Sequence, residues 1–394
     1  MKNGHARKRP WAFVISLIAI AVVVLAVLPF VAMVVLYENT FGKRINAPEN
    51  IAHTVEEFDG LMRTRHTFVS DKGQEIVGYL YKRDGVQYKG AAVLAHGFGS
   101  GGHCSYLAAV DYLVKNGYMT FAYDVTGNDE SGGKSVRGLP QGVIDLNNAI
   151  TYAEGLDEFR ELPVVLFGHS WGGYSVSNVL RYHPEVRAAA VLSGFNRSTD
   201  LVESYARKMF GDSVKYLMPY EGLYERLKFG EYASNTALES FGRSSMPVMV
   251  VQGSADNVVP AEYGYDKWYD VYGDSERFTF LWVEGKGHGD VLFDNTPSRQ
   301  AVPAEAGEAG QEALEASQAA VQTEQGPAEA LEPAQTETAQ EGEGQDGTKK
   351  QENALLNVLT NNRPSRTGEA KRLSSIYEEV GSKVIEFFDR YCVK

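Results

Sequence analysis

The chain has 394 residues, of which 43% are hydrophobic and 23% charged, as is typical of a globular protein with a sizeable core. Its formal net charge of −13 argues against a nucleic-acid partner, because phosphate backbones are bound by basic surfaces. The two cysteines, Cys104 and Cys392, are too few for a disulfide framework. Two free thiols are expected, and a single Cys104–Cys392 disulfide outside the cytoplasm is the alternative.

The N-terminal region has the pattern of a membrane-spanning helix. Four lysines and arginines lie within residues 2–9, and residues 11–37 carry no charge, a length that crosses a bilayer core with some tilt. Trp11 and Tyr37 stand at its ends, where interfacial aromatics occur. A cleaved signal peptide would have a shorter apolar core, and a buried core helix, the other alternative, rarely lacks charge over such a length. We expect a single span with residues 1–10 in the cytoplasm and everything after residue 40 outside.

After an expected linker over residues 38–60, strand-like and helix-like segments alternate from 61 to 297. A hairpin is predicted first, with strands at 65–70 and 75–83. The alternation that follows predicts right-handed βαβ units and an α/β fold, with a mainly parallel sheet covered by helices on both faces. Further strands are predicted at 91–96, 118–124, 163–168, 188–194, 247–253 and 278–285, with helices at 104–117, 140–155, from 171, and at 261–272.

Two segments interrupt this alternation. Residues 196–244 are aromatic-rich and helical in pattern, which indicates a cap over the carboxyl ends of the strands. Residues 298–352 are expected to be a disordered acidic insertion, because 301–350 hold 11 acidic residues, 2 basic residues and no aromatic residue. From 353 to 394 a final helix should complete the domain, with apolar residues at helical spacing: Leu373, Ile376, Val380, Val384 and Phe387.

The segment VVLFGHSWGGYS, residues 164–175, joins a buried strand to a helix through the pattern G-x-S-x-G at 168–172. This pattern is typical of a nucleophile elbow. Its glycines are needed because a strand that turns sharply into a helix crowds the backbone around the central residue. Ser170 is therefore the candidate nucleophile, and a glycine-rich structural turn is the alternative.

A serine nucleophile needs a base and an orienting acid, which in this topology follow it in the order Asp, His. Asp256 follows a strong strand, and His288 follows the last predicted strand in a glycine-rich loop. The alternative for His288 is a solvated loop histidine. The alternatives for the acid, none of which directly follows a strand, are Asp266, Asp290 and Asp294.

An oxyanion hole needs two converging backbone N–H groups. The candidates are the amides of Trp171, which follows the nucleophile, and of Phe98, in the loop HGFGSGG after an earlier strand. His96 is expected to be a structural hydrogen-bonding residue, and His169 to point into the packing. No histidine cluster has metal-ligand spacing and no dinucleotide-binding pattern is found, so no metal and no cofactor are expected.

These motifs resemble those of serine hydrolases of the α/β-hydrolase superfamily, closest to the branch of monoacylglycerol lipases, lysophospholipases and serine aminopeptidases. The resemblance covers about residues 65–295 and the final helix. It rests on HGF at 96–98, GHSWG at 168–172, GSADNVV at 253–259 and GHGD at 287–290. It implies an α/β-hydrolase fold with Ser170 as nucleophile, Asp256 as acid, His288 as base, and the amides of Phe98 and Trp171 as oxyanion hole.

One loop departs from that branch, which often has D-x-R-G-x-G-x-S after the fourth strand and uses this loop to border the pocket. Here Asp124, Gly127 and Ser131 are kept, but Thr126 replaces the arginine and Asp129 the second glycine.

The membrane helix and the aromatic cap favour a lipid ester, such as an acylglycerol or a lysophospholipid, cleaved through an acyl-enzyme. One alternative is a peptidase, which would need a cap carboxylate for the substrate amine: Glu203, Glu221 or Glu225. The other is a non-catalytic, membrane-tethered binding module on the same fold.

Overall fold

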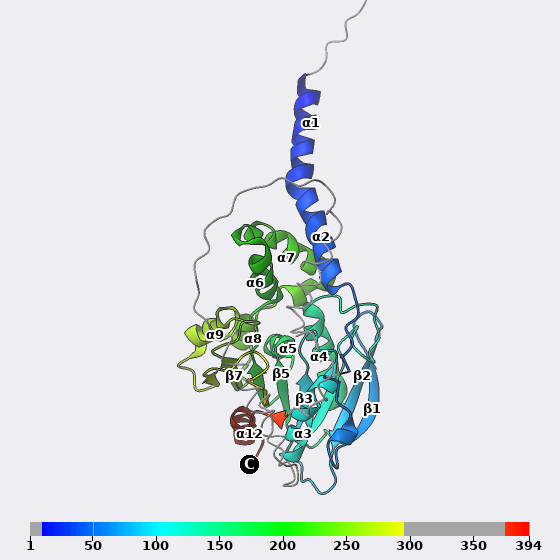
Figure 1. Ribbon diagram of the computed structural model, residues 1–394, viewed down its shortest axis with the longest axis vertical. Helices are drawn as coiled ribbons and strands as arrows, with labels where there is room; N and C mark the ends of the chain where they lie inside the picture. The colour runs from blue at the N-terminus through cyan, green and yellow to red at the C-terminus, as the bar shows by residue number, and fades with distance from the viewer. Residues whose placement is uncertain (1–9, 50, 295–374, 394) are drawn as a thin grey trace, which may run out of the picture. The chain divides into compact units, whose positions relative to one another are not determined.

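A computed structural model describes residues 10–49, 51–294 and 375–393 (Figure 1). Its centre is an eight-stranded sheet in the order β1-β2-β4-β3-β5-β6-β7-β8. The pairs β1–β2 and β2–β4 are antiparallel, and every later pair is parallel. The strands are β1 (Met62–Val69), β2 (Glu75–Lys82), β3 (Gly90–Ala95), β4 (Tyr118–Tyr123), β5 (Val164–His169), β6 (Ala188–Leu192), β7 (Val248–Gly253) and β8 (Phe278–Val283). The prediction of a mostly parallel α/β sheet is confirmed.

Both faces of the sheet are covered, which explains why the central strands are hydrophobic at every position rather than alternating. All residues of β3 to β7 are buried, and successive side chains enter opposite cores: Val93 one, Leu94 the other. The first core is closed by helices α4 (Pro140–Glu154), α5 (Trp171–Val179), α8 (Ala237–Arg243) and α9 (Tyr265–Tyr272), and the second by α3 (Leu107–Lys115) and α12 (Glu378–Cys392). Short helical turns are η2 (Val55–Glu57), η3 (His103–Tyr106) and η6 (Ala261–Tyr263).

Between β6 and β7 the chain forms a group of helices in the segment expected to be a cap. Gly211 and Gly230, with φ of 72° and 63°, end the two longest of them. The elements before α8 are α6 (Ser198–Phe210), η4 (Asp212–Tyr216), α7 (Met218–Phe229) and η5 (Gly230–Ala233).

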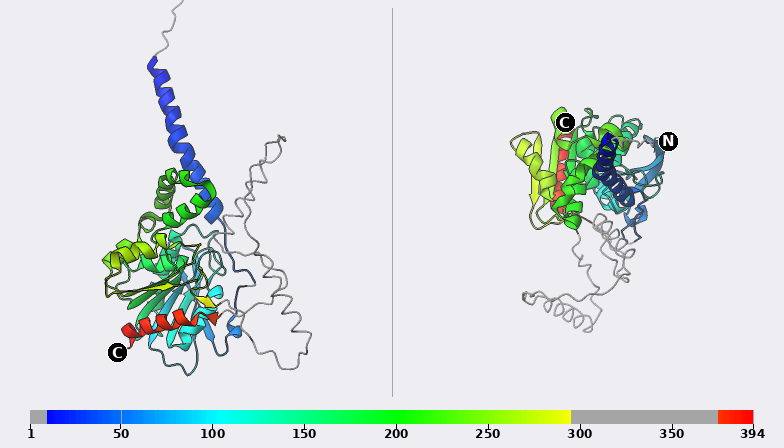
Figure 2. Two further views of the ribbon diagram at one scale, coloured as in Figure 1. Left: turned by 60° about the vertical axis from the view of Figure 1, so that its left-hand side comes forward. Right: turned by 90° about the horizontal axis from the view of Figure 1, so that it is seen from above.

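The N-terminal helical run consists of α1 (Pro10–Val22), the π-helical turn η1 (Val23–Val27) and α2 (Leu28–Phe41). Pro29 explains the irregular turn, because it has no N–H for the carbonyl of Leu25 four residues earlier and its ring displaces that carbonyl. The hydroxyl of Tyr220 on α7 donates to the Leu25 carbonyl instead, at 2.6 Å. In Figure 1 and in the left view of Figure 2 the lower part of α2 lies beside α7.

Phe13–Phe41 is long and apolar enough to cross a membrane, with a mean hydropathy of 3.1 in its most apolar window. Only 6% of that window is buried within the chain, whereas the core helix of a soluble protein is mostly buried. A signal sequence near the N-terminus would have the same length and composition. The predicted cytoplasmic segment, residues 1–10, lies outside the described residues except for its last position.

The C-terminal helix begins later than the sequence pattern suggested. Ile376, predicted to be helical, lies in the short strand β10 (Ser375–Ile376), which pairs with β9 (Phe293–Asp294). This pairing is continued by the N–H of Tyr377, which donates to the carbonyl of Leu292, so the helix starts only at Glu378. Val380, Val384 and Phe387 are buried as expected. Leu373 and the predicted disordered insertion at 298–352 lie outside the described residues.

The segment after α2, expected to be a linker, is hydrogen-bonded to the loop that follows β4. The Ile45 N–H donates to the carbonyl of Gly127 at 3.0 Å, and the guanidinium of Arg44 donates to the carbonyls of Ser131, Gly133 and Asp129. Both cysteines are free, in agreement with the expectation of two thiols.

Candidate active site

Ser170 stands at the turn from β5 into α5 with φ 59° and ψ −118°, a backbone conformation that a residue with a Cβ rarely adopts. Its N–H donates to the carbonyl of Leu192 at 2.9 Å, which fixes the turn against β6. A Cβ on Gly168 would lie 2.3 Å from the carbonyl oxygen of Gly172, and one on Gly172 would lie 1.9 Å from that of Ala95. The glycines of the motif are therefore required by crowding.

Three of the predicted site residues form a continuous hydrogen-bonded line. The Nε2 atom of His288 is 2.8 Å from the Oγ atom of Ser170, and its Nδ1 atom is 2.8 Å from an Oδ atom of Asp256. Each of the three residues is 9% exposed, so the line is shielded yet reachable from solvent. This is the geometry in which a histidine can take the proton of a hydroxyl group.

Asp256 is held as a carboxylate. Burial alone would raise its pKa, but the neighbouring His288 and the amide donors lower it below the usual value. Its second oxygen accepts the N–H groups of Val258 and Val259 at 3.0 and 2.9 Å. Of the four candidate acids, Asp256 is the hydrogen-bond partner of His288.

The amides predicted for an oxyanion hole lie on the two segments that flank Ser170. Trp171 is the first residue of α5, so its N–H has no acceptor within the helix. Gly97 lies next to the nucleophile, since a Cβ there would lie 3.4 Å from the Cβ of Ser170. Phe98, the next residue, is therefore also close to Ser170. The rings of Phe98 and Trp171 pack edge to face, 5.3 Å apart.

His169 is a residue whose importance the sequence did not reveal. Its Nε2 atom faces the carbonyl oxygen of His288 at 2.9 Å and must carry the proton, because a carbonyl only accepts. Its Nδ1 atom then accepts from the hydroxyl of Tyr106 at 2.8 Å. Burial, and after it the neighbouring His288, lower the pKa of His169 to about 3, so the ring is neutral. His169 thereby fastens the His288 loop to the elbow.

His96 has the structural role that was expected. Its Nδ1 atom is 2.8 Å from the carbonyl of Gly97, and its Nε2 atom accepts the N–H of Val125 at 3.0 Å. Burial lowers the pKa of the ring, which favours the neutral form.

In the loop at 124–131, the two residues that depart from the related branch, Thr126 and Asp129, form hydrogen bonds to other segments of the chain. Asp129 has φ 29°, a conformation suited to glycine and tolerated by aspartate. One carboxylate oxygen accepts the N–H of Ala47 at 2.6 Å and the other that of Gly102 at 2.8 Å. Thr126 accepts from the side chain of Gln74 at 2.9 Å. The loop is thus bound to the chain that leaves α2.

The three cap carboxylates have different surroundings. Glu203 forms an ion pair with Arg207. Glu225 is buried and accepts from the hydroxyls of Tyr37, at 2.8 Å, and Ser198. Glu221 is fully buried, and neither of its oxygens has a hydrogen-bond partner among the described residues. Burial, and then the charge of Glu225, raise the pKa of Glu221 well above its usual value.

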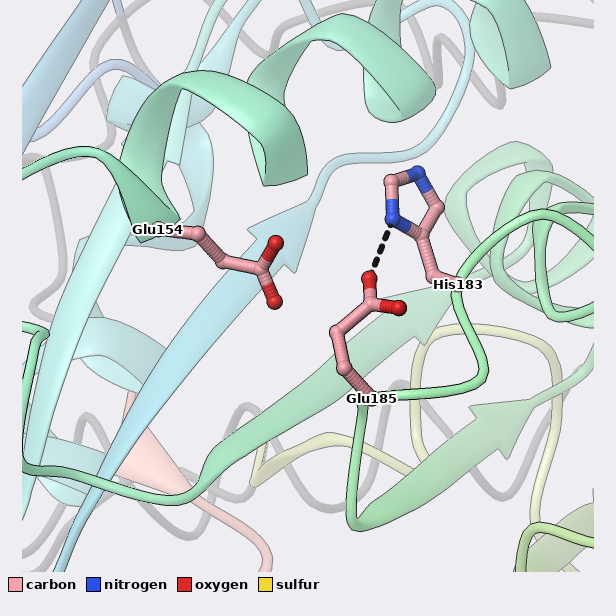
Figure 3. Close-up of side chains that lie close together, drawn as sticks. All are labelled: Glu154, His183 and Glu185. Carbon is pink, nitrogen blue, oxygen red and sulfur yellow. Dashed lines mark hydrogen bonds and ion pairs between the residues drawn. The ribbon is translucent and has the colours of Figure 1, made fainter.

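A second polar cluster lies away from this site (Figure 3). Glu154 at the end of α4, with His183 and Glu185 before β6, place potential metal-ligand atoms within 4.8 Å of one another. The His183 Nδ1 atom is 2.6 Å from Glu185, and burial followed by the charge of Glu185 raises the pKa of Glu154 to about 7. The cluster lies at the amino ends of β5 and β6, opposite Ser170, and ligand spacing along the chain does not reveal it. These side chains can share a proton or hold a cation.

Comparisons with known proteins agree with the fold and the motifs. The family model described as "Serine aminopeptidase, S33" matches residues 87–219, which include Phe98, Ser170 and Trp171 but neither Asp256 nor His288. A monoacylglycerol lipase of Mycolicibacterium smegmatis is 32% identical over 135 residues, 34% of this chain. The chain spans about half of that relative's length, 46%.

Among solved structures, an esterase of Pyrococcus furiosus is 16% identical with a TM-score of 0.48, covering 62% of this chain and 90% of its own. Est1E of Butyrivibrio proteoclasticus, solved with ferulic acid, is 18% identical with a TM-score of 0.43, covering 57% and 90%. The strand order is that of an α/β-hydrolase fold, and the sequence is similar to serine aminopeptidases over residues 87–219 and to a monoacylglycerol lipase over 135 residues.

Proposed function

We propose that this protein is a membrane-anchored serine hydrolase that cleaves a carboxylic ester of the acylglycerol or lysophospholipid kind. The observation that carries the proposal is the line Asp256–His288–Ser170, with both hydrogen bonds at 2.8 Å and the serine on a strained elbow. The glycines on either side of Ser170 cannot carry a Cβ without a clash, which supports the interpretation of this turn as a nucleophile elbow.

The chemistry follows from the positions of these atoms. Ser170 Oγ attacks the ester carbonyl while His288 Nε2 takes its proton, and Asp256 keeps the imidazole oriented and stabilises its charged form. The amides of Phe98 and Trp171 bind the oxyanion. His288 then protonates the leaving alcohol. Water, activated by the same histidine, attacks the acyl-serine and releases the acid.

The lipid substrate is supported by the similarity to a monoacylglycerol lipase over 135 residues and by the apolar surface of the cap. Four large hydrophobic side chains of the cap are exposed: Phe210, Tyr216, Leu223 and Leu227. Such a surface suits contact with a bilayer.

The N-terminal helix supports the anchor. Its residues from 11 to 28 are exposed wherever their burial is described, and a helix of that length is about 27 Å long, close to the thickness of a hydrocarbon core. Residues 29–41 pack partly on the domain, so the proposed span is shorter than the 11–37 expected from charge alone. The basic N-terminus favours a catalytic domain outside the cytoplasm.

A peptidase is the second candidate, and Glu221 is the observation that favours it. A buried cap carboxyl without a hydrogen-bond partner is a possible site for a substrate ammonium group. Its raised pKa weakens this candidate, since a protonated carboxyl does not attract a cation. Comparing acylglycerols with aminoacyl amides as substrates distinguishes the two functions.

The deciding experiment labels the full-length protein in detergent with a fluorophosphonate. Wild type and a Ser213→Ala control, altered at an exposed cap serine, should be labelled, and Ser170→Ala should not. A folded wild type that resists labelling would refute the activated serine and favour the binding module.

A further inference from the structure

Helices α2 and α6 border an open apolar groove, whose space amounts to about 520 Å³ when the solvent at its mouth is included. The lining comes from both helices and from the segment before α4, and includes Met33, Leu36, Phe41, Leu139, Leu201 and Ala206.

The polar atoms of this lining are already bound within the protein. Thr40 donates to the Leu36 carbonyl at 3.0 Å, and the hydroxyl of Tyr205 donates to the carbonyl of Val258 at 2.7 Å. Tyr37 donates to Glu225. A ligand that needs hydrogen bonds, such as a sugar or a peptide, would lose those it makes to water, whereas a hydrocarbon chain would lose none.

Two residues that line the groove contact residues of the candidate active site. The ring of Phe41, which lines the groove, packs edge to face on that of Phe98 at 5.7 Å, and Phe98 packs on Trp171. Leu139 lines the groove as well, and its carbonyl accepts the indole N–H of Trp171 at 2.8 Å. Phe41 and Leu139 therefore separate the groove from Phe98 and Trp171, whose amides are proposed to bind the oxyanion, by the width of a single side chain.

The outer end is continuous with the surface suited to lipid. Phe210, in the last turn of α6, lines the groove and is 49% exposed. On α2, Val31 and Val35 are exposed beside the buried Met33. Towards the N-terminus the helix continues as an exposed apolar surface.

Helix α2 is fixed to the cap and does not act as a loose tether. Glu38 forms an ion pair with Lys228 and accepts the hydroxyl of Tyr224 at 2.6 Å. Further along the helix, Tyr220 binds the carbonyl of Leu25 that Pro29 leaves free.

We propose that this groove binds the acyl chain of a monoacyl membrane lipid and guides its ester to Ser170, so that the membrane helix is itself one wall of the substrate site. The inference rests on the proposed function for the reaction at Ser170, but chain binding does not require that reaction.

Photo-crosslinking tests the groove without catalysis. Full-length Ser170→Ala protein in phosphatidylcholine vesicles is irradiated with a monoacylglycerol that carries a diazirine at the end of its acyl chain. Crosslinks should map to 33–41 and 201–210 and should decrease when unlabelled monooleoylglycerol is added. Crosslinks confined to residues 11–28, or unaffected by the competitor, would overturn the proposal, because they would reflect ordinary contact with lipid.

A groove-filling variant provides the second test. For each variant, kcat/KM is measured for a long-chain ester and for a two-carbon ester, and the first value is divided by the second. Ala206→Trp should lower this ratio at least tenfold. Val35→Trp, on the exposed face of α2, should leave the ratio as in wild type. An unchanged ratio in Ala206→Trp contradicts the groove. If wild type is not labelled by the fluorophosphonate but crosslinks still map to the groove, the proposed reaction is refuted and acyl-chain binding in the groove is retained.

Discussion

At the residue scale, His169 shows how one buried, neutral histidine can position the histidine of the candidate active site. Its Nε2–H donates a hydrogen bond to the backbone carbonyl of His288 at 2.9 Å. This bond matters because His288 lies in a glycine-rich loop. We expect His169→Phe to lower kcat about 10- to 100-fold with little change in KM, because small misplacements of a catalytic group cost that much. Steady-state kinetics on a soluble ester measures both constants.

Tyr106→Phe is the matched control for this prediction. It removes the hydroxyl that orients His169 but leaves the bond from His169 to His288, so its effect on kcat should be smaller. Equal losses in the two variants, or a loss confined to KM, would mean that His169 does not act by positioning His288.

Glu221 makes the stability of the protein depend on pH. Its pKa is raised well above 4.5 in the folded state, first by burial and then by Glu225, so the unfolded chain releases the proton at lower pH. Stability is therefore lost as pH rises above about 4.5. Glu221→Gln, which removes this ionisation, should match wild type in Tm near pH 4.5 and exceed it as the pH rises from there.

The control for this prediction is Glu203→Gln, which removes an ion pair with Arg207 and should lower Tm slightly or not at all. Parallel Tm curves for Glu221→Gln and wild type from pH 4.5 to 9 would show that Glu221 is not held protonated.

At the scale of elements, the loop after β4 connects the segment that leaves α2 to the sheet. Asp129 binds the amides of Ala47 and Gly102, in a position where the related branch often has glycine. Asp129→Gly should relieve the backbone conformation but lose both bonds, with a net destabilisation of about 1–2 kcal/mol. Limited proteolysis should then cut residues 42–60 faster than in wild type, whereas unchanged cutting would show that Asp129 does not hold this segment.

The regular elements were predictable because their signals are local. Buried strands in αβ alternation and the crowded glycines around Ser170 are properties of neighbouring residues in the chain. Contacts between distant segments left no such signal. Ile376 fits a helical pattern but pairs with Phe293, and the polar cluster brings Glu154 from a different helix to His183. His169 was predicted to point into the packing, and its bonds to Tyr106 and His288 depend on two other loops.

At the scale of the whole molecule, the N-terminal helix was predicted from its length and lack of charge, but its contact with the cap was not. Tyr37, which belongs to the span predicted from hydropathy, contacts the cap through Glu225. Glu38, the first residue after that span, contacts it through Lys228. An apolar helix face that packs on protein has the same composition as one that faces lipid, so only the fold separates residues 29–41 from those before them.

The orientation of the anchor is the remaining prediction. Four basic residues precede the helix and two, Lys43 and Arg44, follow it closely, so the domain should lie outside the cytoplasm. In a background without Cys104 and Cys392, Ser213→Cys on the exposed cap should react with a membrane-impermeant maleimide on intact cells. His5→Cys, on the other side of the helix, should react only after lysis. The reverse pattern would place the hydrolase in the cytoplasm, with its groove open to the inner leaflet. Reaction of both cysteines without lysis would mean that the helix does not span the membrane.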